Sequence, residues 1–416
     1  VSLDSALGRQ RRLNSVGESV LQIAPNAAAA YSLRSLTGGD PKVVRVRRGS
    51  NNVESDFTAS GVSSGALLDF VTTSQIGWNA QPTFSNAAGT GSITSQSSTA
   101  TTATVSFTGE ASLIRENSKP NHVLGSSGDQ VIFNISVSGL DSAGTLRLRT
   151  SGTNTTVGSS TVSNGNNQDI TLNLTGSAGY LAMTFVASSG GTITFNSIKV
   201  LPKSGFVETW YDQSGNSEDA VQATAGSQPK IVNAGSLVVD SAGLPEIDFD
   251  GSNDCLTASS YSRSGEDLPL TMISVFNQDV AGVDYVVSLN QTDNNAFDRI
   301  LLRTDSFDYG RRATDNTFKA GSGSDPDVNT KYLFTAINAG TTSSGFVDGS
   351  SIFSGVDTNV GTQALNQIDI GLNNGDSSGG LNPFDGKIQE IIIYETDQSD
   401  NRLALEANIM TNYGIS

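Results

Sequence analysis

The sequence has one cysteine, one histidine and only 16% charged residues, and each scarcity excludes a class of protein. Cys255 cannot form a disulfide within the chain, and we expect it to be a small buried side chain behind a polar turn. One Cys and one His also argue against a structural zinc site, and we do not expect His122 to act as the base of a Ser-His-Asp triad. No run approaches ~18 consecutive apolar residues, so membrane insertion is not expected.

Small polar residues are abundant instead. The 416 residues include 44 glycines, and clusters of Gly, Ser, Thr and Asn separate short runs of β-branched side chains. This composition predicts an all-β protein. A chain of this length exceeds what one hydrophobic core usually organises, so we expect two domains or more.

The formal net charge of −17 is unevenly distributed. Residues 1–50 carry eight Lys or Arg against three acids, residues 74–201 carry five of each, and residues 202–416 carry eleven against thirty. An acidic surface opposes nucleic-acid binding, which depends on neutralising phosphates. Residues 1–30 are predicted to be an N-terminal arm whose basic residues either contact an acidic protein scaffold during assembly or form a solvated tail; these basic residues are Arg9, Arg11 and Arg12.

Helix signals gather near the N-terminus. Apolar residues between Leu13 and Leu21 fall near helical spacing until Pro25, and a second short helix is predicted over residues 27–36. A strand is expected over residues 43–48, where apolar and basic side chains alternate, followed by a helix over residues 65–71.

Residues 74–201 have the pattern of a β-sandwich of their own. Gly, Ser and Asn clusters separate the strand-like runs at intervals typical of that architecture. The predicted strands cover residues 93–94, 102–108, 131–137, 145–149, 169–174, 180–186 and 192–200.

Strands resume after this segment, and the chain ends in a predicted amphipathic helix over residues 402–413. Asp348-Gly349 is a favoured tight-turn dipeptide and marks the tip of a hairpin. The predicted strands cover residues 272–277, 285–289, 300–304, 332–338, 345–347, 368–372 and 387–394.

The most informative stretch is Phe-Val-Glu-Thr-Trp-Tyr-Asp-Gln-Ser-Gly-Asn at residues 206–216, an apolar strand that runs into a sharp polar turn. With residues 27–34, 43–52, 228–231 and 247–256, it forms an ordered set that resembles a jelly-roll domain of bacteriophage virion proteins. The set is similar, more distantly, to the catalytic domain of arabinofuranosidase B. In the resembling phage proteins these segments follow closely, so residues 74–201 are interpreted as an inserted domain.

The later strands are similar to laminin-G or concanavalin-like sandwiches, so residues 31–73 and 202–416 are predicted to form one split jelly roll. The insert resembles jelly-roll carbohydrate-binding modules of glycosidases and phage fibres, on its opening residues 76–79 and closing residues 193–200. Such modules stack sugars on exposed aromatic rings. The candidates are Trp78, Phe84, Phe107 and Tyr180, most of which we expect in the core; Trp78 and Tyr180 are kept as candidate sugar contacts.

The resemblance to arabinofuranosidase B raises the question of catalysis. Such a retaining glycosidase uses a Glu nucleophile and an Asp acid/base, and Asp376 lies in a Gly-Asn-rich loop that matches the second. No Glu occurs between Glu266 and Glu390, where the nucleophile would lie, and the adjacent cysteine pair of that family is missing. Asp305 or Asp308 could replace the Glu nucleophile, but the shorter side chain would hold its carboxylate back by about one bond length. We therefore predict no catalytic residue, and Asp376 is kept as a candidate sugar contact or turn former.

No cofactor is predicted, with Ca²⁺ left open. Laminin-G-like sandwiches often hold calcium through loop carboxylates and carbonyls. The candidate ligands are Asp248, Asp250 and Asp254, or Asp293 and Asp298, and the alternative is that these are acidic turns facing water.

Together these observations favour a non-enzymatic structural protein of a bacteriophage virion, as a fibre, capsid-decoration or tail-associated subunit. No N-terminal signal peptide is visible, which disfavours export by the general secretory route. Expected partners are other virion proteins and host-surface glycans, with homo-oligomers such as trimers adding avidity. Two alternatives stay open: a glycan-binding adhesin without an assembly role, and an arabinofuranosidase-like glycoside hydrolase.

Overall fold

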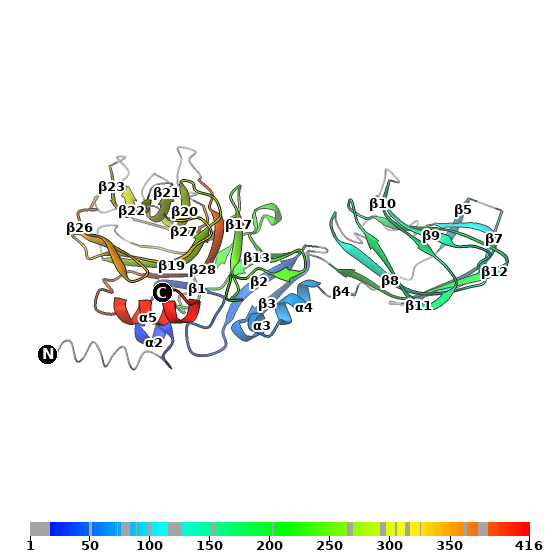
Figure 1. Ribbon diagram of the computed structural model, residues 1–416, viewed down its shortest axis with the longest axis horizontal. Coiled ribbons are helices and arrows are strands. Elements are labelled where there is room, and N and C mark those ends of the chain that lie inside the picture. Colours follow the sequence, from blue (N-terminus) through cyan, green and yellow to red (C-terminus); the bar gives the residue numbers. More distant parts are fainter. Residues whose placement is uncertain are drawn as a thin grey trace.

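The computed structural model describes residues 17–49, 52–72, 74–75, 84–88, 90–98, 102–114, 127–150, 155–201, 204–263, 269–291, 297–303, 306–312, 317–324, 326–360, 364–372 and 382–416. The predicted fold class is confirmed. The chain is mostly antiparallel β-structure, arranged as two sandwich domains with few helices (Figure 1).

The larger domain, called here the outer sandwich, contains the segments on both sides of the insert. Its helices are α2 (Val20–Ile23), α3 (Ala59–Ser63), α4 (Ala66–Thr72), the short 3-10 helix η2 (Ala225–Ser227) and α5 (Arg402–Tyr413). Its strands are β1 (Ala29–Ser32), β2 (Lys42–Arg48), β3 (Glu54–Thr58), β13 (Gly205–Trp210), β14 (Ala220–Val221), β15 (Lys230–Asn233), β16 (Ser236–Leu237), β17 (Ile247–Asp250), β18 (Leu256–Ala258), β19 (Leu270–Gln278), β20 (Asp284–Asn290), β21 (Phe297–Arg303), β22 (Ser306–Arg312), β23 (Phe318–Ser322), β24 (Lys331–Asn338), β25 (Ser343–Val347), β26 (Ser350–Val356), β27 (Gln367–Ile370) and β28 (Asp385–Tyr394).

The second domain, called here the insert, lies beside the outer sandwich along the long axis of the molecule (Figure 1). Its strands are β4 (Ser74–Gln75), β5 (Ser85–Ala88), β6 (Ser92–Ser98), β7 (Ala103–Ile114), β8 (Gln130–Ser138), β9 (Gly144–Arg149), β10 (Thr156–Val162), β11 (Gly165–Asn173) and β12 (Tyr180–Leu201).

Backbone pairing joins the chain on the two sides of the insert. Strand β2 pairs with β13 in antiparallel register, with Val46 opposite Val207. The helix that precedes the insert packs where the following strand begins, because a Cβ at Gly205 would lie 2.7 Å from the side chain of Val71. The insert therefore leaves and re-enters the outer sandwich at nearly one point, which is how an inserted domain avoids disturbing its host.

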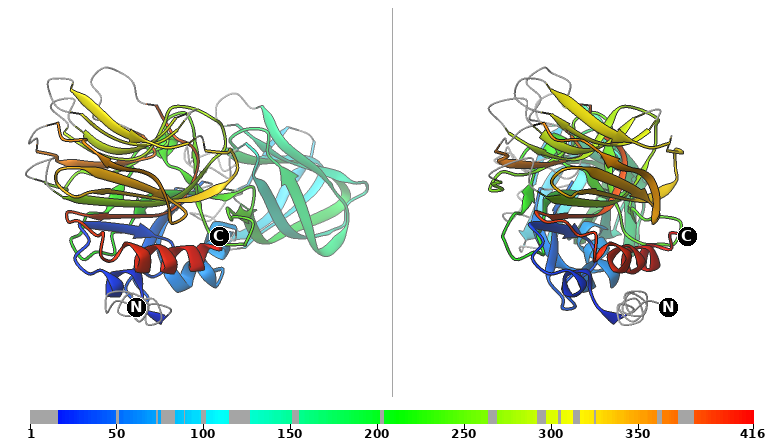
Figure 2. Two further views of the ribbon diagram at one scale, coloured as in Figure 1. Left: turned by 60° about the vertical axis from the view of Figure 1, so that its left-hand side comes forward. Right: turned by 90° about the vertical axis from the view of Figure 1, so that its left-hand side faces the viewer.

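Strand β28 is apolar on both faces because both faces are covered. Ile391 and Ile393 join the main core between the sheets, whereas Ile392 and Tyr394 join a second core on the other side. Helix α5 forms that second core together with α2, and it lies across the outside of the sheet formed by β19 and β28 (Figure 2). The run Ile391–Tyr394 is thus the sequence signature of a strand buried on both sides.

The N-terminal prediction was wrong in one element. Residues 27–36 were expected to be a helix, but Ala29–Ser32 form strand β1, which pairs with β28. Tyr31 faces the main core and Ala30 the second core, so tertiary burial on both faces overrides the helix propensity of the alanines. Val20 of α2 is also fully buried, so residues 20–30 of the predicted arm pack within the outer sandwich.

The insert has a hydrophobic core of its own. Two predicted strands, residues 180–186 and 192–200, are one long strand, β12, whose register shifts between Ala187 and Gly191. The strand pairs with β7 on both sides of that shift, with β9 before it and with β8 after it, so it passes from one sheet of the sandwich to the other. Strand β10 was not predicted, because its sequence is mostly Thr, Ser and Gly.

Candidate functional site

The stretch that stands out in the sequence forms a loop that closes one edge of strand β1. Residues 212–219, called here the 212–219 loop, follow β13 directly. On its other side β1 pairs with β28. An unpaired strand edge would expose backbone donors and acceptors, and here side chains of the loop bind them.

Asp212 is the organising residue of this loop. Its Oδ1 accepts hydrogen bonds from the amides of Ala30 (2.8 Å) and Ser214 (2.9 Å). Its Oδ2 accepts from the hydroxyl of Ser214 (2.6 Å) and the amide of Glu218 (3.2 Å). Gly215 has φ +92°, a backbone conformation that favours glycine, so the loop can reverse sharply at this point. One carboxylate thus holds both the loop and the strand behind it.

The neighbouring amide side chains extend the same closure. The backbone amide of Gln213 donates to Ala30 O (2.8 Å), and its side chain donates to Ser32 O and accepts from the amide of Leu36. Asn216 Nδ2 donates to Ala27 O (2.9 Å) and Ala28 O (3.0 Å). The polar turn expected from the sequence is present, and its side chains bind the backbone of the neighbouring N-terminal segment.

A polar pocket of about 560 Å³ opens beside this loop. Its size is within the range of pockets that hold small molecules. The described residues that line the polar pocket are Asn26, Ala27, Ala28, Ser214, Asn216, Glu218, Tyr261, Ser262 and Glu395. They come from four separate parts of the sequence and include amides, hydroxyls, one aromatic ring and two carboxylates.

Glu218 is held in place from several sides. The hydroxyl of Tyr31 donates to the Glu218 carbonyl (2.6 Å), and the hydroxyl of Ser260 donates to Glu218 Oε2 (2.6 Å). Burial and the nearby Asp212 raise the pKa of Tyr31, so its hydroxyl stays protonated as a donor. Glu218 Oε1 has no hydrogen-bond partner among the described residues, which leaves it available to a ligand.

Glu395 and Asn26 complete the polar pocket on the side of β28. Glu395 follows Tyr394, whose hydroxyl donates to Ala24 O (3.0 Å). The Glu395 side chain is exposed and bonds to no residue that the structure describes. Asn26 is exposed as well, on left-handed backbone with φ +66°. Both side chains are therefore accessible to a ligand at the rim of the polar pocket.

The site residues predicted from the sequence mostly fall outside the described residues. These are Trp78, Asp376, Arg9, Arg11 and Arg12, together with His122. Tyr180 begins β12 opposite Arg149, but its side chain is outside the described part of the structure. Phe84 and Phe107 are buried in the core of the insert, so neither can be a sugar platform.

The candidate calcium ligands that the structure describes have other roles. Asp250 Oδ1 accepts from the amide of Ser252 (2.9 Å), and Asp254 Oδ2 accepts from the amide of Asp250 (3.1 Å). Asp248 lies 3.7 Å from Lys387 Nζ. Over the described ranges, no three potential ligands converge on one point. Asp293 and the side chain of Asp298 are not among the described parts, and Cys255 is 5% exposed, as expected.

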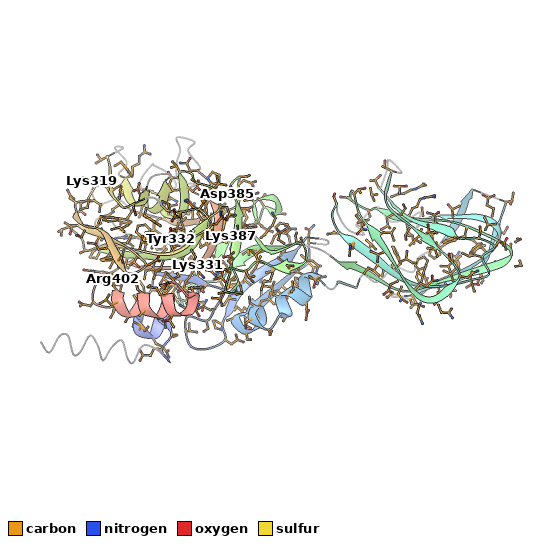
Figure 3. All side chains as sticks on the ribbon, in the orientation of Figure 1. Lys319, Lys331, Tyr332, Asp385, Lys387 and Arg402 are labelled. Atoms are coloured by element: carbon orange, nitrogen blue, oxygen red, sulfur yellow. The ribbon has the colours of Figure 1, made fainter. Side chains whose placement is uncertain are left out.

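A second group of charges lies where β24 and β28 meet the chain before β17 (Figure 3). Asp240 accepts hydrogen bonds from Lys331, Gln389, and the amides of Ala242 and Leu244. Burial opposes ionisation of Asp240, but these bonds lower its pKa. Burial raises the pKa of the adjacent Glu246 to about 7; Asp240 adds to this effect, and Lys387 and Lys331 oppose it.

A raised and a lowered carboxyl pKa side by side can mark an acid and a base, but this pair is poorly placed for catalysis. Glu246 is only 4% exposed, and every oxygen of Asp240 is already engaged. Asp308, one substitute nucleophile considered from the sequence, is also buried, on β22. Asp240 links Lys331 of β24 to Gln389 of β28, and none of these three acidic residues lines the polar pocket.

A buried polar cluster, missed from the sequence, crosses three neighbouring strands. Asp369 on β27 accepts from the Thr257 hydroxyl of β18 (2.7 Å) and from the Asn290 amide of β20 (2.7 Å). Gln367 donates to the same carboxylate (2.7 Å). Alternation along β27 would have predicted a solvent-facing Asp369, but the side chain is fully buried.

Comparison with known proteins shows a distant likeness of fold. No protein-family model matches the chain, and no curated protein matches it by sequence. A native heptameric SAP-like pentraxin from Limulus polyphemus is similar with a TM-score of 0.32 and 13% identity, over 38% of this chain and 79% of the pentraxin. A Trypanosoma rangeli sialidase in complex with the inhibitor DANA gives 0.35 and 15%, over 49% of this chain and 30% of the sialidase.

The CBM40 of Ruminococcus gnavus IT-sialidase, bound to α2,6 sialyllactose, gives 0.30 and 9%, over 36% of this chain and 99% of the module. These proteins share β-sandwich architecture with the chain, and the match spans less than a third of the Trypanosoma sialidase. At such TM-scores the likeness assigns no site and no activity. No helix among the described residues is long and apolar enough to cross a membrane.

We predict that Asp212→Ala destabilises the protein by about 2–4 kcal/mol, because several backbone and hydroxyl donors lose their acceptor at once. The measurement is the free energy of unfolding in urea. Asp250→Ala is the matched control, since that carboxylate caps only its own exposed turn; its loss should cost about 1 kcal/mol or less. Equal losses in the two variants would contradict the organising role of Asp212.

We predict that Glu246→Gln stabilises the protein above about pH 7. The folded-state pKa of Glu246, about 7, exceeds the ordinary value of 4.5, so the folded protein binds a proton that the unfolded chain has released. The free energy of unfolding of the wild type therefore falls as pH rises through this interval, and Gln cannot titrate. Urea unfolding should show a gain of about 1–2 kcal/mol for the variant near pH 8 that vanishes near pH 4. If the free energies of unfolding of the wild type and the variant change with pH in parallel, the assignment of this pH dependence to Glu246 is wrong.

Proposed function

We propose that this protein is a non-enzymatic structural subunit of a bacteriophage virion that presents its sandwich domains to host-surface glycans. The polar pocket beside the 212–219 loop is the observation that carries the glycan-binding part. The virion part is supported by the resemblance of residues 27–34, 43–52 and 206–216 to virion jelly rolls.

The chemistry of the polar pocket suits a sugar. Sugar hydroxyls both donate and accept hydrogen bonds, and carboxylate acceptors make the stronger, charge-assisted bonds. Glu218 Oε1 and the Glu395 carboxylate supply such acceptors, and the hydroxyl of Ser262 adds a group that can donate or accept. Tyr261 also lines the wall, but it is only 3% exposed and packs in the main core, so its ring is no platform for a sugar.

The proposed lack of enzymatic activity is supported by the missing Glu nucleophile of the arabinofuranosidase-like pattern, and we assign no catalytic role to Glu218 or Glu395 of the polar pocket. Catalysis by a retaining glycosidase needs two carboxyl groups ~5 Å apart on opposite sides of the scissile bond. Among the described residues, Glu246 and Asp308 are buried and the side chain of Asp240 is 4% exposed. Asp376 has no Glu partner in the sequence where the related nucleophile would lie.

Assembly on a particle would give weak sugar contacts their strength. Single pockets for neutral sugars bind weakly, whereas several copies held at fixed spacing gain avidity without new contacts. We propose that the chain forms homo-oligomers such as trimers, with the basic segment before residue 17 contacting other virion proteins and the acidic outer sandwich facing outward. The virion is then its location.

We predict that Glu395→Ala weakens glycan binding by about tenfold or more, because it removes a charge-assisted acceptor from an exposed position without disturbing the core. Glycan-array screening of the wild type identifies the ligand, and titration of that ligand measures the loss. Glu54→Ala, on the exposed end of β3, is the control and should bind like the wild type. Absence of any bound glycan, or full binding by the Glu395 variant, would contradict the proposed site.

Deletion of residues 1–16 should remove the chain from purified particles while leaving both sandwiches folded. The cut stops before residue 17 because Val20, Ala24 and Ala27 are buried, and a longer deletion would unfold the domain. Electron microscopy with an antibody to the chain, together with a thermal melt of the truncated protein, makes the measurement. If purified virions do not carry the full chain, the virion assignment is wrong and the adhesin alternative is favoured. If virions still carry the truncated chain, residues 1–16 are not the docking segment.

A further inference from the structure

We infer that the polar pocket selects sugars that carry no anionic group, through the charges of Glu218 and Glu395. This inference rests on the proposed glycan-binding function and goes beyond it by naming the chemical class of the ligand. The inference depends on three observations: the carboxylates that line the polar pocket, the acidic residues behind the 212–219 loop, and the hydrogen bonds that fix Glu218.

The charge at the polar pocket has one sign. Its described lining contains two carboxylates and no Lys or Arg side chain. Asp212 and Asp219 lie directly behind the loop, where Asp219 Oδ1 accepts from the amide of Asp212 (2.9 Å). Arg45, the cation that interacts with Asp219, is already paired with Asp56 at 2.7 Å. A ligand that enters this pocket therefore meets two carboxylates and no Lys or Arg among the described lining residues.

Glu218 cannot easily turn away from such a ligand, whereas Glu395 adds its charge from an exposed side chain that is not fixed. Ser260 fixes one oxygen of Glu218, and the backbone of Glu218 is fixed by Tyr31 and Asp212. A uronic or sialic acid would place its own carboxylate among these groups and lose water in doing so, with no described cation to receive it. A neutral sugar instead presents hydroxyl protons, which the same oxygens accept.

The bland alternative is that water fills the polar pocket and that Glu218 only ties the 212–219 loop to Ser260. That role uses Oε2 and leaves Oε1 and the whole Glu395 side chain without a structural purpose among the described residues. Two open acceptors that face one sugar-sized cavity favour a ligand with several donors.

The test compares sugars that differ in one substituent and in the charge that it carries. Methyl glycosides of glucose, galactose and mannose are titrated into the full chain against the corresponding uronic acids, with ligand-observed NMR as the readout. Glucosamine is the positively charged member of the series. We expect at least one neutral sugar to bind, its uronic acid to bind about tenfold more weakly or worse, and glucosamine to bind at least as well as glucose.

Two variants assign the discrimination to residues. Glu395→Gln and Glu218→Gln keep hydrogen-bonding groups of the same size and remove one charge each, and the second still accepts from Ser260. Each variant should reduce the ratio of the affinities for the neutral sugar and for its uronic acid severalfold, whereas Glu54→Gln should leave this affinity ratio unchanged. Raising the salt concentration should narrow it as well, because screening weakens repulsion between partly exposed charges.

The outcomes separate this inference from the function on which it rests. Equal binding of a neutral sugar and its uronic acid, or a ratio that neither Gln variant changes, overturns the charge selection and leaves glycan binding in place. No binding of any member of the series, together with an empty glycan array, overturns both.

Discussion

The outer edge of strand β1 is closed by side chains that follow it in the sequence by about 180 residues. Asp212, Gln213 and Asn216 bind backbone groups between Ala27 and Leu36, so the loop after β13 holds the N-terminal segment on the side that β28 leaves open. The location of the polar pocket follows from this closure, because the loop that satisfies the strand also forms one wall. A single structural requirement thus explains both the polar sequence after β13 and the position of the polar pocket.

Burial on both faces distinguishes the centre of the outer sandwich from its margins. Strands β19 and β28 contribute alternate residues to the main core and to the core under α5, whereas the insert's β8 alternates between core and solvent. Asp240 lies before β17 and is bound by Lys331 and backbone amides, whereas the carboxylates at the polar pocket stay open.

The sequence predicted what is local and failed where distant contacts decide. Helix α5 was predicted at its observed bounds because Leu405 and Ile409 repeat at helical spacing, and most longer strands followed from alternation. Strand β1 was missed because its alanines favour a helix until β28 supplies a partner, and β10 because Thr, Ser and Gly resemble a loop. The loop at Asp212 was recognisable, but Tyr261 and Glu395 carry no local signal that they face it. Only the fold brings these residues together.

The pairing of β1 with β28 has a consequence for biosynthesis. Residues near the start of the chain find their strand partner about 360 positions later, whereas the insert closes its own core by residue 201. A ribosome releases the chain from its N-terminus, so the insert can fold while strands β1 and β2 of the outer sandwich still lack their later partners. The insert is then folded while the outer sandwich is not, and the outer sandwich can fold only after β28 and α5 have left the exit tunnel.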